Sequence, residues 1–373
     1  MIADDACIHT RERTKLTALA RCHTVLAIVL TLAALPGTAG AAEFIREDIR
    51  VPMLAAGPRG LEGIVVRTDQ RGRHPLALIN HGSPREASQH SEMSPFQYYL
   101  PAIEFARRGW TAAVVMRRGF GASGGGFREN IGSCNNPNYL RAAAASVADL
   151  TAMIAFLVKR PDVDATRILS VGHSAGGFAT VALTAAPPPA LRAAISFAGA
   201  SGSEKPDSVC QADREVAAFA EFGKQSRIPM LWVYAENDHF FGPALAERFR
   251  AAFTGAGGRA DFVKAAPFGD DGHSLFASPA GIPIWTPMVD DFLKAQNLVL
   301  RSDLSPPPTP PQIAPSSQLS AASRSIFAQF PAAASGAAAR HFEFSAIFSS
   351  AGFQVCCSCC TKAVASSGDM ARV

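Results

Sequence analysis

The stretch Val171-Gly-His-Ser-Ala-Gly-Gly177 decides the fold, because it joins a predicted strand to a predicted helix through a Gly-x-Ser-x-Gly turn. The strand is expected at residues 165–172 and the helix at residues 175–186. Glycines on both sides of the serine permit a tight turn, which holds the serine in a strained backbone conformation and exposes its hydroxyl. The start of the helix adds a dipole that favours a developing anion. The motif in this setting predicts that Ser174 is a nucleophile.

Short β-branched runs alternate with longer helical stretches on both sides of this turn. The first three strands have no helix between them, which predicts an antiparallel start, and strict alternation then predicts parallel strands with right-handed crossovers. The expected fold is a doubly wound, mostly parallel, eight-stranded α/β sheet with helices on both faces. The strands are expected at residues 47–53, 61–68, 74–80, 110–116, 165–172, 191–198, 228–235 and 260–265, and the helices at residues 94–108, 138–159, 175–186, 213–225, 243–255 and 284–297.

A serine hydroxyl needs a base and an orienting carboxylate, and in this fold they follow the serine in the order acid, then histidine. His273 lies between the last predicted strand and the last predicted helix, so it can reach the carboxyl edge of the sheet. Asp238 follows the strand at residues 228–235 and is the expected acid, with Glu236 as its rival. His239 directly follows Asp238, too close to use it as an orienter. The alternative for Asp238 is a turn cap.

An acyl-transfer intermediate also needs backbone donors for its oxyanion. The N–H of Ala175, directly after the serine, is one expected donor. The other is expected in Asn80-His-Gly-Ser-Pro84, where Ser83 is favoured because Pro84 has no N–H. His81 is expected to hold this loop by hydrogen bonds. The glycine-rich residues 116–126 resemble a phosphate loop but lack its lysine-serine ending, which favours a structural turn beside the site.

Composition excludes one class of partner. The chain has 373 residues, 18% of them charged, with a formal net charge of +4. No lysine- or arginine-rich block stands out in the region of the predicted strands and helices, so nucleic-acid binding has no support. No metal site is expected, because the cluster Cys356-Cys-Ser-Cys-Cys360 lacks the two separated ligand sets of structural zinc sites.

The two ends of the chain differ from the middle. Residues 1–41 read as a signal peptide, with basic residues, an apolar run of about 13 residues and a small-residue site at Ala39-Gly40-Ala41. The alternative is a membrane anchor, which the short run disfavours. Cleavage near Ala41 would give a periplasmic or secreted protein. The domain with the alternating strands and helices is expected at residues 42–298, a proline-rich linker at 299–316 and a poorly ordered tail with a cysteine cluster at 317–373.

Export also makes two cysteines informative. In an oxidising compartment, Cys134 and Cys210 are expected to form a disulfide, which would tie two loops over the cleft. The alternative is two free thiols.

Five motifs together resemble the dienelactone-hydrolase-like branch of the α/β-hydrolases, over about residues 47–297: Asn80-His-Gly, Arg118-Gly-Phe-Gly-Ala-Ser, Gly172-His-Ser-Ala-Gly-Gly, Glu236-Asn-Asp and Asp271-Gly-His. The resemblance implies cofactor-free hydrolysis of esters or similar acyl compounds. The namesake enzymes carry a cysteine where Ser174 stands, so dienelactone itself is not the expected substrate. Secreted relatives of the prolyl-oligopeptidase type share the triad, which leaves a serine peptidase or acylaminoacyl hydrolase as the alternative. A catalytically silent binding protein would be expected to lack a triad residue.

Overall fold

The computed structural model describes residues 43–300. The expected signal peptide, nearly all of the proline-rich linker and the C-terminal tail with its cysteine cluster lie outside these residues.

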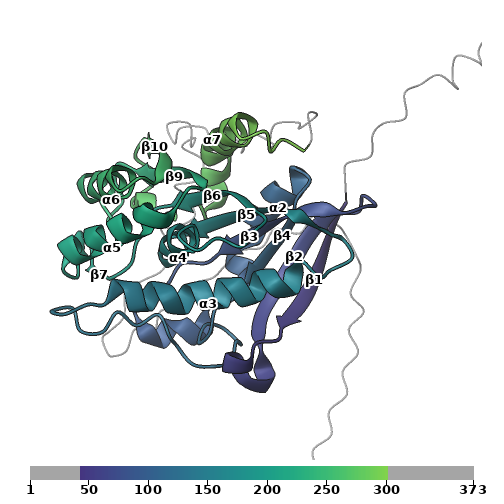
Figure 1. Ribbon diagram of the computed structural model, residues 1–373, viewed down its shortest axis with the longest axis horizontal. Coiled ribbons are helices and arrows are strands. Elements are labelled where there is room, and N and C mark those ends of the chain that lie inside the picture. The colour runs from purple at the N-terminus through teal and green to yellow at the C-terminus, as the bar shows by residue number, and fades with distance from the viewer. Residues whose placement is uncertain (1–42, 301–373) are drawn as a thin grey trace, which may run out of the picture. The chain divides into compact units, whose positions relative to one another are not determined.

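Eight strands form one sheet in the order β1-β2-β4-β3-β5-β6-β9-β10. β1 pairs antiparallel with β2, β2 pairs antiparallel with β4, and all the other neighbours are parallel (Figure 1). The predicted mostly parallel α/β sheet is therefore confirmed. The strands are β1 Phe44–Val51, β2 Leu61–Thr68, β3 His74–Asn80, β4 Thr111–Val115, β5 Val163–His173, β6 Leu191–Phe197, β9 Pro229–Ala235 and β10 Arg259–Ala265.

Helices cover both faces of this sheet. α2 and α7 pack on one face, and α3, α4, α5 and α6 pack on the other, where Figure 1 shows α3 running across the sheet. The α-helices are α2 Tyr99–Arg107, α3 Tyr139–Leu157, α4 Ala175–Leu183, α5 Ala212–Gln225, α6 Pro243–Gly255 and α7 Ile282–Ala295. The 3₁₀ turns are η1 Leu54–Arg59, η2 Ala87–Glu92, η3 Pro95–Tyr98, η4 Gly272–Ser274 and η5 Pro279–Gly281.

Alternation along the buried strands explains how one sheet serves two layers. In β3, Ala77 and Ile79 contact the α2 and α7 layer, whereas Leu76 and Leu78 contact the α3 and α4 layer. Successive strand residues point to opposite faces, so a strand covered on both sides must be apolar throughout. This is why β3, β4 and β9 read as continuous apolar runs.

Some elements differ from the predicted ones. The helix expected at residues 94–108 begins as the 3₁₀ turn η3, because Pro95 opens it and Ser94 caps it through the Phe96 N–H. A small hairpin of β7 (Ser203–Lys205) and β8 (Ser208–Val209) was not predicted. Its strands are two or three residues long, too short to show the alternation by which strands are recognised.

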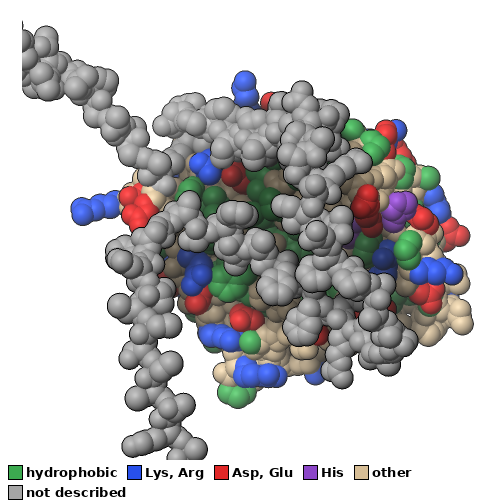
Figure 2. All heavy atoms as spheres, turned by 180° about the vertical axis from the view of Figure 1, so that it is seen from behind, with side chains coloured by type: hydrophobic (Ala, Val, Ile, Leu, Met, Phe, Trp, Pro, Cys, Tyr) green, Lys and Arg blue, Asp and Glu red, His purple; other side chains and the backbone are tan. Residues whose placement is uncertain are grey.

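Within residues 43–300, α3 has the length and composition that would let a helix cross a membrane, and 44% of its most apolar window is buried. Its buried side chains, Leu150 and Met153 among them, belong to the core beneath the sheet. Packing against the sheet accounts for the same composition. On the face opposite that of Figure 1, acidic and basic side chains of the described residues are interspersed (Figure 2).

Candidate active site

Ser174 lies at the turn between β5 and α4. Its backbone has φ 55° and ψ −124°, a conformation that side chains other than glycine rarely adopt. The Ser174 N–H donates to the carbonyl of Phe197 on the neighbouring strand β6, which holds the turn at the carboxyl edge of the sheet. The structure thus places the serine in the strained strand-to-helix turn that the motif predicts.

The glycines of the motif are required by close backbone contacts. A Cβ on Gly172 would lie 2.1 Å from the Gly176 carbonyl oxygen. A Cβ on Gly176 would lie 2.2 Å from the carbonyl oxygen of Asn80, at the end of β3. Any side chain at either position would push α4 away from the sheet, and Ser174 with it.

His273 and Asp238 come together from two different loops. The Nδ1 atom of His273 lies 3.0 Å from Oδ2 of Asp238 and 3.2 Å from Oδ1, and both side chains are buried. This hydrogen bond favours the tautomer with the proton on Nδ1, so Nε2 is left as an acceptor. Ser174 and His273 line the same cavity. Within residues 43–300 the Ser174 hydroxyl has no hydrogen-bond partner. A hydrogen bond between a nucleophile and its base often forms only when substrate binds.

Asp238 is held as a carboxylate by its surroundings. Burial raises its pKa, but the hydrogen bond to His273 and two backbone donors outweigh burial, so the pKa lies below its ordinary value. The donors are the N–H groups of Phe240 and Phe241, at 2.7 and 2.9 Å. Asp238 therefore caps its turn and orients His273 at once. The rival Glu236 is half-exposed and lies 3.5 Å from Lys264 instead.

The expected oxyanion donors border the same cavity as the serine. Ser83, Ser174 and Ala175 line one cavity, and within the described part of the chain neither the Ser83 nor the Ala175 N–H has an acceptor. A Cβ on Gly82 would lie 3.1 Å from Cβ of Ser174, so the glycine lets this loop approach the serine. Two backbone donors beside one nucleophile can stabilise a tetrahedral oxyanion.

A chain of hydrogen bonds that the sequence did not reveal links this loop to His273. The Gly82 N–H donates to the hydroxyl of Tyr98 at 2.8 Å, and that hydroxyl lies 2.9 Å from Nδ1 of His173. Nε2 of His173 lies 2.7 Å from the carbonyl oxygen of His273. Burial, and then the nearby His273, lower the pKa of His173 to about 3, so it is neutral and donates from Nε2. The bonds fix the loop and His273 relative to each other.

His81 holds the same loop by hydrogen bonds, as expected. Its Nδ1 donates to the carbonyl of Gly82 at 2.6 Å, and its Nε2 accepts from the Arg117 N–H at 2.9 Å. Arg117 is fully buried, pairs with Glu129 and donates to the His81 carbonyl. Burial lowers the pKa of His81 well below its ordinary value, so it is a neutral structural group. The glycine-rich residues 116–126 thus act as a structural turn beside the site.

Arg85, Phe240 and His273 form a stack over the site. The Phe240 ring lies 3.9 Å from the His273 ring at an interplanar angle of 12°, and the Arg85 guanidinium lies 3.3 Å from the Phe240 centroid. Arg85 also donates to the hydroxyl of Ser203 and to the carbonyl of His239, both at 3.0 Å. No motif marked this stack, because its members come from three separate loops.

The site is a cleft with two lobes that meet at Ser174. The histidine lobe, about 400 Å³, is lined by His273, Tyr98, His173, Met93, Gln97 and Glu92. The loop lobe, about 320 Å³, is lined by Ala175, Phe127, Ile131, Ala200, Phe241 and Arg85. Ser83, Pro84, Ser174 and Phe240 border both lobes.

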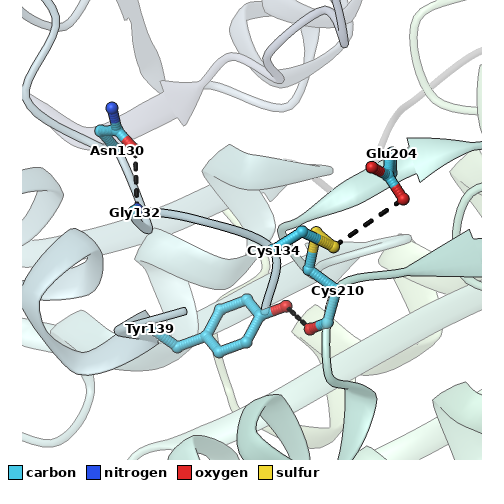
Figure 3. The surroundings of a disulfide bond; sticks show 6 residues. All are labelled: Asn130, Gly132, Cys134, Tyr139, Glu204 and Cys210. Carbon is cyan, nitrogen blue, oxygen red and sulfur yellow. Dashed lines mark hydrogen bonds between the residues drawn. A yellow bond between two sulfur atoms is a disulfide. The ribbon is translucent and has the colours of Figure 1, made fainter. Parts of the chain in front are cut away.

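Cys134 and Cys210 are joined by a disulfide, with their Cα atoms 4.7 Å apart (Figure 3). Cys134 follows the loop that carries Phe127 and Ile131, and Cys210 follows the segment that carries Ala200. Glu204 lies 3.8 Å from the Cys134 sulfur. Because the two sulfurs are bonded to each other, this group of three side chains offers no thiolates to a metal.

Comparison with solved structures shows the fold. Esterase 2 of Thermogutta terrifontis, phosphorylated by paraoxon, is 15% identical with a TM-score of 0.51 over 69% of this chain and 96% of its own. The acylaminoacyl peptidase of Pyrococcus horikoshii is 17% identical with a TM-score of 0.50, over 71% of this chain and 44% of its own. A comparison with curated proteins finds no match. The strand order, the serine turn and these likenesses define the α/β-hydrolase fold.

A family model narrows this class. The model described as the dienelactone hydrolase family matches residues 135–283, which include Ser174, Asp238 and His273. This part of the chain is similar to the dienelactone hydrolase family, which agrees with the resemblance that the motifs carry.

Proposed function

We propose that this protein is a serine-dependent hydrolase of carboxylic esters or related acyl compounds. Ser174 attacks the carbonyl carbon, and Nε2 of His273 takes the hydroxyl proton and returns it to the leaving group. Asp238 orients His273 and stabilises its protonated form. The N–H groups of Ala175 and Ser83 bind the oxyanion, and water then releases the acyl group from Ser174 by the same steps in reverse order.

The observation that carries this proposal is the convergence of separate loops on one cavity. The strained serine, a histidine hydrogen-bonded to a buried carboxylate and two free backbone donors meet where the cleft divides. A structural role alone does not require a strained serine to border a cavity beside a paired histidine.

The test is a fluorophosphonate probe on the intact chain, beside Ser174→Ala and, as matched control, Ser278→Ala, which lies outside both lobes and whose side chain makes no capping hydrogen bond. Wild type and Ser278→Ala are expected to be labelled and to hydrolyse p-nitrophenyl acetate. Ser174→Ala should lose the label and roughly 10⁴-fold or more in kcat, while its circular dichroism spectrum stays unchanged. A labelled Ser174→Ala protein, or no labelling of wild type, would contradict the proposal. Faster turnover of aminoacyl amides than of matched esters would favour a peptidase with the same triad.

A further inference from the structure

The cleft divides at Ser174, so the acyl part and the alcohol part of an ester can occupy different lobes. The inference about which part enters which lobe rests on the proposed function. His273 lines only the histidine lobe, whereas the Ala175 N–H borders only the loop lobe. In acyl transfer the histidine protonates the leaving group, so the leaving oxygen must lie beside Nε2 of His273. With the oxyanion held by the backbone donors, the acyl chain has to leave the reaction centre away from His273.

We infer that the loop lobe is the acyl-binding subsite and takes a neutral, apolar acyl group of short to medium length, and that the Cys134–Cys210 disulfide sets the width of this subsite. The histidine lobe then receives the alcohol.

The lining of the loop lobe argues for an apolar acyl group. Its bulkiest uncharged side chains are apolar, those of Phe127, Ile131, Phe240 and Phe241, and polar side chains such as His90, Asn130 and Ser203 complete the lining. Its volume of about 320 Å³ lies at the lower end of the range of ligand pockets, which favours an acyl group of short to medium length.

The charges of the loop lobe are already committed. Glu129 is paired with Arg117. Arg85 lies against the Phe240 ring, donates through two of its nitrogens and is surrounded by Asp271, Asp238 and Asp207. The negative charge of these three aspartates already offsets that of Arg85, so a neutral acyl chain fits better than a carboxylate.

Two chain segments supply walls of the loop lobe, residues 127–131 and residues 200–203. The disulfide joins the continuations of these two segments (Figure 3). On one wall the Ile131 carbonyl accepts from the Asn138 N–H at 2.6 Å, at the start of α3. On the other wall the Cys210 N–H donates to the Gly202 carbonyl at 2.9 Å. Each cysteine is thereby tied closely to its own wall, so the bond between them limits how far the walls can separate.

The test compares two ester series on the full chain. The acyl series is p-nitrophenyl acetate, butyrate and hexanoate, with the adipate monoester as a charged analogue of hexanoate. The alcohol series is phenyl and 1-naphthyl acetate. The variants are Ile131→Trp in the loop lobe, Gln97→Trp in the histidine lobe and the exposed Ile284→Trp on α7 as a matched control outside both lobes.

Ile131→Trp is expected to lower the hexanoate-to-acetate ratio of kcat/KM by about tenfold or more, with the naphthyl-to-phenyl ratio within about twofold of wild type. Gln97→Trp is expected to do the reverse, and Ile284→Trp to change neither ratio. Wild type should prefer hexanoate over the adipate monoester by about tenfold or more. Exchanged effects of the two tryptophans, an unchanged acyl ratio in Ile131→Trp, or preference for the adipate monoester would each overturn the assignment.

The disulfide is tested by the double variant Cys134→Ser with Cys210→Ser, and by wild type treated with a reductant under native conditions in case the double variant does not fold. Loss of the bond is expected to raise the hexanoate-to-acetate ratio by about threefold or more, with the alcohol ratio unchanged. An unchanged acyl ratio after verified reduction would overturn the role of the disulfide. If Ser174 is labelled and esters are hydrolysed but the acyl and alcohol ratios do not change as expected, this inference alone is wrong. If Ser174 is not labelled, the proposed function is wrong.

Discussion

At the scale of single residues, Asp238 shows how one side chain meets two demands. Its Oδ1 accepts from two backbone N–H groups of its own turn, and both oxygens face Nδ1 of His273. A capping role and a catalytic role are usually weighed against each other from sequence. Here the cap fixes the carboxylate at the position from which it can orient the histidine.

Asp238→Asn should therefore separate the two roles. Asparagine keeps an oxygen for the Phe240 and Phe241 N–H groups, but its amide cannot stabilise protonated His273 and favours the wrong tautomer. We expect kcat for ester hydrolysis to fall about 10⁴-fold with little change in thermal stability. The control Glu236→Gln, which alters an exposed carboxylate beside Lys264, should stay within about twofold of wild type. A large loss in Glu236→Gln with an active Asp238→Asn would make Glu236 the acid.

At the scale of secondary-structure elements, close packing of α4 against the sheet positions the reaction centre. α4 supplies the Ala175 N–H from its first turn, and Gly176 brings that turn against the end of β3. The helix is nine residues long and almost wholly buried, so it has no room to shift.

Gly176→Ala tests this packing. The new Cβ would lie 2.2 Å from the Asn80 carbonyl oxygen and 2.4 Å from that of His81, and both atoms belong to rigid backbone. We expect the free energy of unfolding in urea to fall by about 3 kcal/mol, and kcat to fall with it because Ala175 moves. Gly255→Ala, at the end of α6 with nothing within 4 Å of the new Cβ, is the matched control and should stabilise the protein by up to about 1 kcal/mol. Equal effects of the two alanines would contradict the argument.

The elements that the sequence predicts are those with a strong local signal. The central strands are apolar on both faces, and the turn at Ser174 has a motif with a steric reason behind it. The chain through Tyr98 and His173 could not be foreseen, because it joins residues 75 positions apart whose side chains meet only once the sheet has formed. The β7–β8 hairpin and the two lobes likewise depend on loop conformations, which carry little local pattern.

At the scale of the whole molecule, Glu215 is a buried carboxyl group for which the proposed reaction has no use. Glu215 at the start of α5 is fully buried and accepts from the Ser201 N–H at 2.6 Å, while its Oε2 has no partner among the described residues. Burial raises its pKa well above the ordinary 4.5, against the smaller effect of that hydrogen bond. The fold thus keeps a protonated carboxyl in its core.

Glu215→Gln should therefore make stability less dependent on pH. Above about pH 4.5 the unfolded carboxyl has lost its proton while the folded one keeps it, so the folded state binds more protons and the free energy of unfolding falls as pH rises. Glutamine has no such proton and still accepts from Ser201. We expect Glu215→Gln and wild type to have equal melting temperatures at pH 4, and the melting temperature of the variant to be about 3 °C or more higher at pH 8.

The control is Glu221→Gln, on the exposed side of the same helix. Its melting temperature should differ from that of wild type by less than about 1 °C at both pH values. A difference between Glu215→Gln and wild type that stays constant from pH 4 to pH 8 would show that the buried carboxyl is not protonated in the folded protein.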